Sequence, residues 1–192
     1  MALEKLGANI EIEAGYVVAT APKGLRGAEI HFDKVTVGGT HTALMAAALA
    51  HGDSVILNAA CEPEVADLAA CLTAMGAKIS GAGTSTIQVQ GVTSLHGARH
   101  SVLPDRIEAG TYAMAVAMTG GDVLLEGASP DLLQAALDSL ALTGTSVTAT
   151  SEGLRVYRNG GGIAPVDVST APFPGFPTDL QAQFMGLMTR SS

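Results

Sequence analysis

Hydrophobic and polar positions along the chain follow a pattern that recurs twice. Three segments each run from the end of an apolar helix, through a glycine, into a short strand. Their central glycines are Gly7, Gly76 and Gly144, which lie 69 and 68 residues apart. Glycine favours the left-handed conformation that ends many helices, so each segment predicts a helix followed at once by a strand.

The helix that opens each repeat is rich in Ala and Met. We expect these two helices to begin at Gly39-Thr40 and at Gly110-Thr111, and to end before Gly52 and Gly121. Short apolar strands should follow at residues 55–57 and 123–125.

A second helix in each repeat is expected to open at a proline. Pro63 and Pro130 suit a first helical position, where no backbone N–H is needed, and Ser129 would cap the second of these helices. Hairpins should then close the repeats, with strands at residues 78–80 and 86–90, and at 146–150 and 154–158.

The predicted repeat is therefore a strand-helix-strand-helix-strand-strand unit with right-handed parallel crossovers. The chain would contain the tail of one unit, two whole units and the head of another. A repeat of this length is one supersecondary unit that buries its helices by stacking on its neighbours. The pattern alone predicts an α/β protein with internal repeats.

Composition and charge exclude several classes of function. The 192 residues could form one large or two small domains. The formal net charge is −8 and the basic residues are scattered, which disfavours nucleic acid as a partner. The longest apolar run, residues 43–50, is too short to span a bilayer, and the N-terminal residues do not follow a signal-peptide pattern. These features favour a cytoplasmic protein without membrane or nucleic-acid partners.

The cysteines and histidines do not suggest a metal site. Cys61 and Cys71 lack metal-ligand spacing, and we interpret them as reduced structural thiols. The five histidines show neither metal-ligand spacing nor a paired partner, and are expected to be surface or structural residues: His31, His41, His51, His96 and His100.

Residues 33–40, with the sequence DKVTVGGT, lead from a strand into a helix. Small residues let backbone amides approach a ligand, and the N-terminus of a helix attracts phosphate. Lys34 adds a positive charge. The same residues could instead form only a structural turn, and the absence of a Walker-type order excludes a nucleotide triphosphatase.

Asp179 lies where Pro177-Thr178 passes into a predicted helix over residues 180–185. An acidic residue at this place can simply stabilise the helix start. It could also act as a general base, provided that it lies within hydrogen-bond reach of the proton it removes. The helix N-terminus would make the carboxylate a weaker base, so its position would matter more than its basicity.

Two further pairs of charged residues lie at predicted helix starts. Asp105-Arg106 could form a hinge salt bridge or a capping pair, or could help to close a site. Glu62 and Glu64 flank Pro63 at another helix start, and we interpret them as capping charges.

Two stretches, LPDRIEAGT at residues 103–111 and TAPFPGFPTD at residues 170–179, resemble the enolpyruvyl transferase family. They are most similar to its branch that acts on UDP-N-acetylglucosamine, and the resemblance covers essentially the whole chain. It implies an incomplete enolpyruvyl transferase-like inside-out α/β barrel, classed as α+β in some schemes, in which six units form two domains. Residues 1–103 would be part of the lid-bearing nucleotide-sugar domain, and residues 104–192 part of the second, homologous domain.

The resemblance also implies an activity. The family member transfers the enolpyruvyl group of phosphoenolpyruvate to the 3-hydroxyl of UDP-N-acetylglucosamine, without a metal or organic cofactor. This is the first committed step of peptidoglycan synthesis, and so serves cell wall biogenesis, cell shape and cell division. Asp179 matches the residue that contacts this hydroxyl and is proposed to remove its proton. Five consecutive residues match the segment that binds the uridine diphosphate: Lys34, Val35, Thr36, Val37 and Gly38.

Other parts of the family's phosphoenolpyruvate site have no counterpart in the chain. These parts are a lid loop with a reactive Cys or Asp, a Lys-Asn pair and several arginines, and neither Cys61 nor Cys71 replaces the lid residue. We therefore expect a fragment that lacks both ends of a longer enzyme and is inactive alone. The alternatives are the shikimate-pathway enolpyruvyl transferase, a non-catalytic scaffold that binds nucleotide sugar, and an RNA-end cyclase, which the acidic charge disfavours.

Overall fold

The computed structural model describes residues 2–192 and divides into two compact units. They comprise Met1–Val102 and Leu103–Ser192, and are called here the N-terminal unit and the C-terminal unit. Helices and three separate sheets confirm the predicted mixed α/β class. Within residues 2–192 these sheets are open and form no closed barrel.

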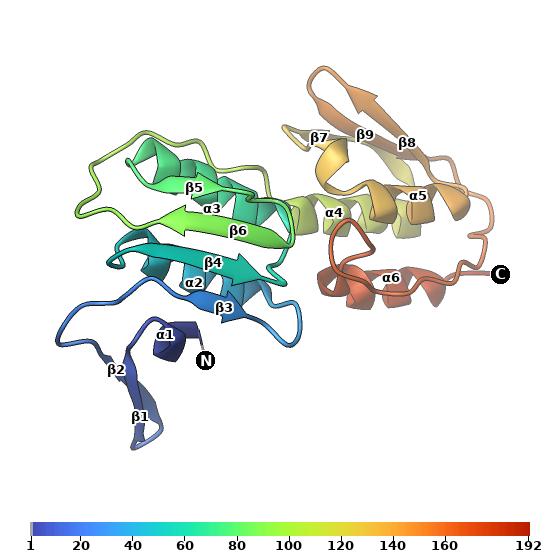
Figure 1. The fold of residues 1–192 in the computed structure, drawn as a ribbon. Coiled ribbons are helices and arrows are strands. Elements are labelled where there is room, and N and C mark those ends of the chain that lie inside the picture. The colour runs from blue at the N-terminus through green and yellow to red at the C-terminus, as the bar shows by residue number, and fades with distance from the viewer. Residues whose placement is uncertain (1) are drawn as a thin grey trace. The chain divides into compact units, whose positions relative to one another are not determined.

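The N-terminal unit holds a short helix and a hairpin, followed by one complete repeat (Figure 1). The strands of the repeat form a sheet in the order β3-β4-β6-β5, in which β3 is parallel to β4 and the other pairs are antiparallel. The predicted strand-helix-strand-helix-strand-strand order is confirmed in this unit. Its elements are α1 (Ala2–Lys5), β1 (Asn9–Glu13), β2 (Tyr16–Thr20), β3 (Glu29–His31), α2 (Val37–Ala48), β4 (Asp53–Leu57), α3 (Pro63–Ala74), β5 (Lys78–Ser80) and β6 (Thr86–Gln90).

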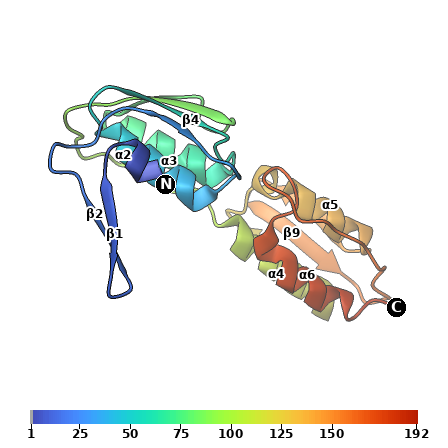
Figure 2. The same ribbon diagram turned by 60° about the horizontal axis from the view of Figure 1, so that its bottom comes forward.

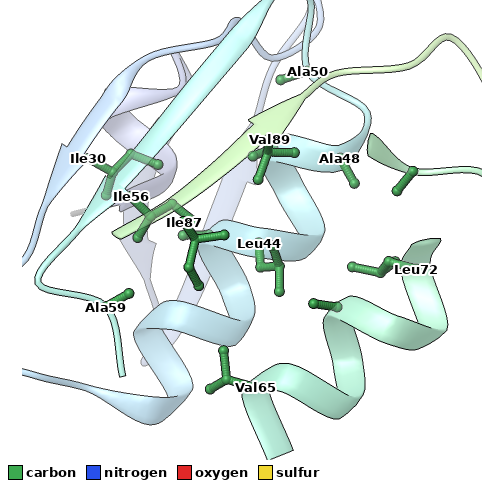
Figure 3. Packing of buried hydrophobic residues seen from close by; sticks show 14 of the residues in the cluster. Ile30, Leu44, Ala48, Ala50, Ile56, Ala59, Val65, Leu72, Ile87 and Val89 are labelled. Atoms are coloured by element: carbon green, nitrogen blue, oxygen red, sulfur yellow. The ribbon is translucent and has the colours of Figure 1, made fainter. Parts of the chain in front are cut away.

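Helices α2 and α3 cover one face of this sheet (Figure 3). Strand β6 alternates exposed and buried residues, so that Ile87 and Val89 point toward the helices. They belong to one cluster with Ile56 of β4, Leu44 of α2 and Val65 of α3. Burial of this apolar face stabilises the unit because it removes hydrocarbon from water.

The C-terminal unit holds a three-stranded antiparallel sheet in the order β7-β9-β8. Helices α4 and α6 lie side by side and share the unit's hydrophobic core (Figure 2). Its elements are α4 (Arg106–Thr119), β7 (Gly121–Glu126), the 3-10 turn η1 (Pro130–Leu132), α5 (Gln134–Leu142), β8 (Ser146–Thr150), β9 (Gly153–Arg158), the 3-10 turn η2 (Thr178–Leu180) and α6 (Gln181–Met188).

The glycine pattern predicted the helix ends and hairpins correctly. Gly7, Gly76 and Gly144 have φ angles of 90°, 103° and 90°, and each lies between a helix and a strand. A residue with a Cβ would be strained in this conformation, which explains why glycine recurs at these positions. Both predicted hairpins, β5-β6 and β8-β9, are present and antiparallel.

The prediction of two whole units was wrong for the second repeat. Among the described residues, no strand lies between β6 and α4, whereas β3 precedes α2 in the first repeat. A strand requires a partner for its backbone groups, and residues 91–105 belong to none of the sheets formed by the described residues. Pro104 also lacks the N–H that a ladder needs.

Two helix starts also differ from the prediction. Helix α4 begins at Arg106, not at Gly110, because the Asp105 side chain caps it. Pro63 occupies the first turn of α3 as expected, but Pro130 opens only the 3-10 turn η1, and α5 begins at Gln134.

The Ser129 side chain makes no capping hydrogen bond, so its predicted role as an N-cap was wrong. Its backbone is extended, but Pro130 removes one N–H of the following turn, and that turn ends after three residues.

Other residues outside the candidate site add two observations. His100 has a partner, contrary to the prediction, because its Nε2 lies 2.9 Å from Oδ1 of Asp67 on α3. Cys61 and Cys71 are free and half-buried.

Within residues 2–192, no helix combines the length and apolar character that crossing a membrane requires.

Candidate functional site

The predicted nucleotide-binding segment, Lys34 to Gly38, forms the entry into α2 in the N-terminal unit. Thr36 is the N-cap of α2, and its Oγ1 accepts a hydrogen bond from the Gly39 N–H at 3.3 Å. Val37 and Gly38 therefore belong to the first turn of the helix, while Lys34 and Val35 precede it and are exposed. The helix begins two residues earlier than the predicted Gly39, because the threonine hydroxyl satisfies an amide of its first turn.

The two glycines of this segment have different surroundings. A Cβ added at Gly39 would lie 2.5 Å from Cγ2 of Thr36 and 3.1 Å from Cε1 of Phe32, so packing requires glycine there. A Cβ added at Gly38 would meet nothing within 4 Å. The backbone at Gly38 is therefore open, as expected where a ligand approaches closely.

An open cavity of about 900 Å³ lies beside this segment. Thr36 and Gly38 line it, together with residues of α1, β1, β2 and β3, whereas Lys34, Val35 and Val37 are not among its lining residues. Its size falls within the usual range for pockets that bind small molecules. The structure thus brings two of the five predicted residues to one cavity of the N-terminal unit.

The charges at this cavity have both signs. Lys5 of α1 lies on its wall with Glu29 of β3 and Asp33. The first turn of α2 contributes the partial positive charge of a helix N-terminus. The cavity can therefore hold an anion beside Thr36 and Gly38, while Glu29 and Asp33 can accept hydrogen bonds from hydroxyl groups of a ligand.

Asp179 lies in the C-terminal unit, in the 3-10 turn η2 that leads into α6. Pro177 occupies the N-cap position and provides no side-chain hydrogen bond. The Asp179 side chain is exposed, and among residues 2–192 no hydrogen bond of its carboxylate is found. Within the described part of the chain Asp179 therefore makes no capping bond, although its negative charge lies in the first turn, where it can stabilise the helix start.

The turn that carries Asp179 is anchored on α4 by two neighbouring side chains. Leu180 is fully buried, and a Cβ added at Gly110 would lie only 2.6 Å from its Cδ1. One turn further, Nε2 of Gln183 donates to Oγ1 of Thr111 at 2.9 Å. Sequence reasoning missed Gln183 and Thr111 as site residues, because their contact joins positions 72 residues apart.

The residues at the start of α4 have structural partners. Oδ1 of Asp105 accepts hydrogen bonds from the N–H groups of Ile107 at 2.8 Å and Glu108 at 2.9 Å, which is a capping arrangement. Arg106 is buried, and its Cζ lies 5.8 Å from the centre of the Phe173 ring. A guanidinium at this distance from an aromatic face is attracted to it, so Arg106 links α4 to the loop that precedes Pro177.

Glu62 and Glu64, which we interpret as capping charges, both lie at the start of α3. Glu62 occupies the N-cap position of α3, but its side chain makes no capping hydrogen bond and is buried. Short side chains such as those of Ser, Thr, Asp and Asn suit this position better than a glutamate does. Glu64 lies in the first turn, where a negative charge stabilises the helix dipole.

Comparison with known proteins gives matches over the whole chain. A family model described as EPSP synthase (3-phosphoshikimate 1-carboxyvinyltransferase) matches residues 1–192. The protein of Afipia carboxidovorans named UDP-N-acetylglucosamine 1-carboxyvinyltransferase is 73% identical over 191 residues, covering 100% of this chain and 44% of its own. The protein of the same name from Beijerinckia indica subsp. indica is 71% identical with the same shares. The chain thus spans under half the length of these curated relatives.

A solved structure shows the same fold. The enolpyruvyl transferase NikO from Streptomyces tendae matches with a TM-score of 0.84 and 23% sequence identity, covering 100% of this chain and 48% of that one. At this identity the likeness concerns the fold alone, and it confirms the predicted enolpyruvyl transferase fold.

Proposed function

The chain belongs to the EPSP synthase family, and we propose that it forms part of a UDP-N-acetylglucosamine 1-carboxyvinyltransferase. The observation that carries this proposal is the 73% identity, over the whole chain, with a relative of that name. Because the chain spans 44% of that relative, the proposed activity belongs to the longer protein.

In the proposed reaction, the 3-hydroxyl of UDP-N-acetylglucosamine receives the enolpyruvyl group of phosphoenolpyruvate, and inorganic phosphate is released. The reaction needs no metal or organic cofactor. It would take place in the cytoplasm, as the first committed step of peptidoglycan synthesis, and would serve cell wall biogenesis, cell shape and cell division.

The segment from Lys34 to Gly38 is proposed to bind the uridine-diphosphate part of the substrate. The open backbone at Gly38 and the first turn of α2 support this role, because backbone amides at a helix N-terminus suit phosphate oxygens. The exposed Lys34 would add a charge to the same anion.

Asp179 is proposed to remove the proton of the attacking sugar hydroxyl. Its exposed carboxylate and the absence of a capping bond among residues 2–192 support this role. A base must first lie within hydrogen-bond reach of the proton, so the placement of the η2 turn would be essential to the rate.

Phosphate release by the complete enzyme tests the proposal. Phosphoenolpyruvate is supplied with either UDP-N-acetylglucosamine or shikimate 3-phosphate, and we expect release only with the nucleotide sugar. Release only with shikimate 3-phosphate would support the second candidate, a 3-phosphoshikimate 1-carboxyvinyltransferase, the enzyme that the description of the family model names. The 192-residue chain alone should stay at background, because transition-state stabilisation requires the whole set of groups.

A further inference from the structure

We propose that Thr111 is a positioning residue for Asp179 and acts through Gln183. This inference rests on the proposed role of Asp179 as the base. Thr111 lies on α4, whereas Asp179 and Gln183 lie on η2 and α6. All three belong to the C-terminal unit.

The turn that carries Asp179 has little structure of its own. It is a single 3-10 turn of three residues, closed by a hydrogen bond from the Leu180 N–H to the Pro177 carbonyl at 3.1 Å. Such turns have poorer hydrogen-bond geometry than an α-helix. The Asp179 side chain is exposed, so the place of its carboxylate depends on how the following residues are anchored.

The first anchor is an apolar contact, which mainly fixes the distance between the η2 turn and α4. Leu180 is fully buried against α4 at Gly110, where the missing side chain leaves room for its methyl groups. Phe184 and Leu187 of α6 are buried in the same cluster as Leu180. Hydrophobic contact is not directional, so this apolar packing holds α6 on α4 without a directional bond that sets its rotation.

The second anchor is a hydrogen bond and therefore has a direction. Nε2 of Gln183 donates to Oγ1 of Thr111 at 2.9 Å, and the Thr111 hydroxyl donates in turn to the Ile107 carbonyl at 2.8 Å. Because the hydroxyl hydrogen is already used, Thr111 can only accept from Gln183. Hydrogen bonds weaken steeply as their angle departs from linearity, so this bond restrains the rotation of α6 about its axis.

The orientation of the Gln183 amide agrees with this interpretation. Its Oε1 is buried and has no hydrogen-bond partner among residues 2–192. Turning the amide over would place that oxygen against the Thr111 hydroxyl, whose hydrogen already goes to Ile107. The bond to Thr111 is therefore the side-chain hydrogen bond that Gln183 makes among residues 2–192.

The consequence for catalysis follows from geometry. Displacing a catalytic group by about 1 Å can lower a rate about 100-fold. Without the Thr111 hydroxyl, the buried Leu180, Phe184 and Leu187 would still hold α6 on α4, but the turn with Asp179 would vary more in orientation. We therefore expect a lower kcat, with the KM values of both substrates nearly unchanged.

The test uses steady-state kinetics of the complete enzyme and three threonine variants. Thr111→Val removes the hydroxyl and keeps the shape of the side chain, whereas Thr111→Ser keeps the hydroxyl. Thr119→Val is the matched control, since Thr119 also donates to the carbonyl four residues before it on α4, Ala115, at 2.9 Å. Thr111→Val should lower kcat by about 10- to 100-fold, while Thr111→Ser and Thr119→Val should stay within about 3-fold of the parent enzyme.

A double variant separates this inference from the proposed function. If Thr111 acts through Asp179, Thr111→Val should lower kcat little further in the Asp179→Asn background. Near-normal turnover of Asp179→Asn would overturn the proposed base. A large loss with Asp179→Asn but none with Thr111→Val, or equal losses from Thr111→Val in both backgrounds, would overturn only the positioning role.

A variant on the other side of the hydrogen bond keeps the inference testable if Thr111→Val does not fold. Gln183→Met keeps an unbranched side chain of similar length and removes the donor. It should reproduce the fall in kcat, and full turnover by this folded variant would also overturn the inference.

Discussion

Asp105 and Asp179 are two aspartates of the C-terminal unit that lie in similar places and have different surroundings. Each follows a proline closely and lies at the start of a helical segment. Asp105 accepts two backbone hydrogen bonds from the first turn of α4, whereas the capping position before η2 is occupied by Pro177. Asp105 is therefore the N-cap of α4, whereas the carboxylate of Asp179 is exposed to solvent. Residue type and position relative to a helix are thus insufficient to assign an aspartate as a cap.

The largest expected effect is on turnover at Asp179. In the complete enzyme, Asp179→Asn keeps the shape of the side chain but removes the basic oxygen. Loss of a general base lowers a rate by about 10²–10⁴-fold, and we expect a fall of this size in phosphate release. The melting temperature should change little. Near-normal turnover in a less stable protein would make Asp179 a helix cap like Asp105.

The start of α2 extends the comparison to a third helix, which Thr36 caps and beside which Lys34 is exposed. Lys34→Ala in the complete enzyme should weaken binding of UDP-N-acetylglucosamine by about 1.5–3 kcal/mol, the usual range for a hydrogen bond to a charged group. Isothermal titration calorimetry measures this change, and the salt dependence of binding should also decrease. Lys23→Ala, at another exposed lysine of the same unit, is the control. Equal affinities of the parent and Lys34→Ala would leave the segment as a structural turn.

Two glycines test the contact between α4 and the turn with Asp179. Gly186→Ala in α6 meets nothing within 4 Å and should stabilise the protein by about 0.5–1 kcal/mol, because glycine is a poor helix former. Gly110→Ala would press on Leu180, and overpacking of this kind usually destabilises by about 1–3 kcal/mol. Urea unfolding should therefore rank Gly186→Ala above Gly110→Ala in stability. The reverse order would show that Leu180 does not fill the space at Gly110.

The capping role of Asp105 predicts a loss of stability. Asp105→Ala should lower the free energy of unfolding by about 0.5–2 kcal/mol, while Asp105→Asn should retain most of it, because asparagine is also a good N-cap. Chemical denaturation of both variants measures the difference. Equal losses from the two variants would mean that the charge of Asp105, and not its capping bonds, stabilises α4.

The smallest effect concerns an aspartate that is exposed but paired. Hydrogen bonding to Arg155, helped by the attraction of its charge, holds the pKa of Asp122 below its ordinary value of 3.8. The pair therefore stabilises the folded protein above that value, and this stabilisation is lost as the pH falls through the lower pKa of the folded state. In Arg155→Met, the free energy of unfolding should depend slightly less on pH in this acidic range. An unchanged pH dependence would show that the pair contributes nothing measurable.

Local signals in the sequence were sufficient for much of the fold. Gly7, Gly76 and Gly144 carry positive φ angles that other residues rarely adopt, so helix ends and the following strands could be predicted from them. The start of α4 could not be predicted in the same way. Gly110 looks like the counterpart of Gly39, but it lies inside a helix and makes room for Leu180, seventy positions away.

Long-range contacts explain what sequence reasoning missed. The strand expected before α4 is absent from residues 2–192, since its formation depends on a partner strand that local pattern does not reveal. The same holds for the candidate site. The resemblance indicated the segment from Lys34 to Gly38 and Asp179. The bond between Gln183 and Thr111 could not be predicted, because it depends on how α6 packs against α4.

The central claim is that Asp179 is a base and Asp105 a cap. The most direct test measures turnover and unfolding free energy for Asp105→Ala and Asp179→Asn side by side in the complete enzyme. We expect Asp179→Asn to lose about 10²–10⁴-fold in turnover with nearly parental stability, and Asp105→Ala to lose stability with turnover of the folded enzyme largely retained. The opposite pattern, or equal losses of turnover in both variants, would contradict this assignment.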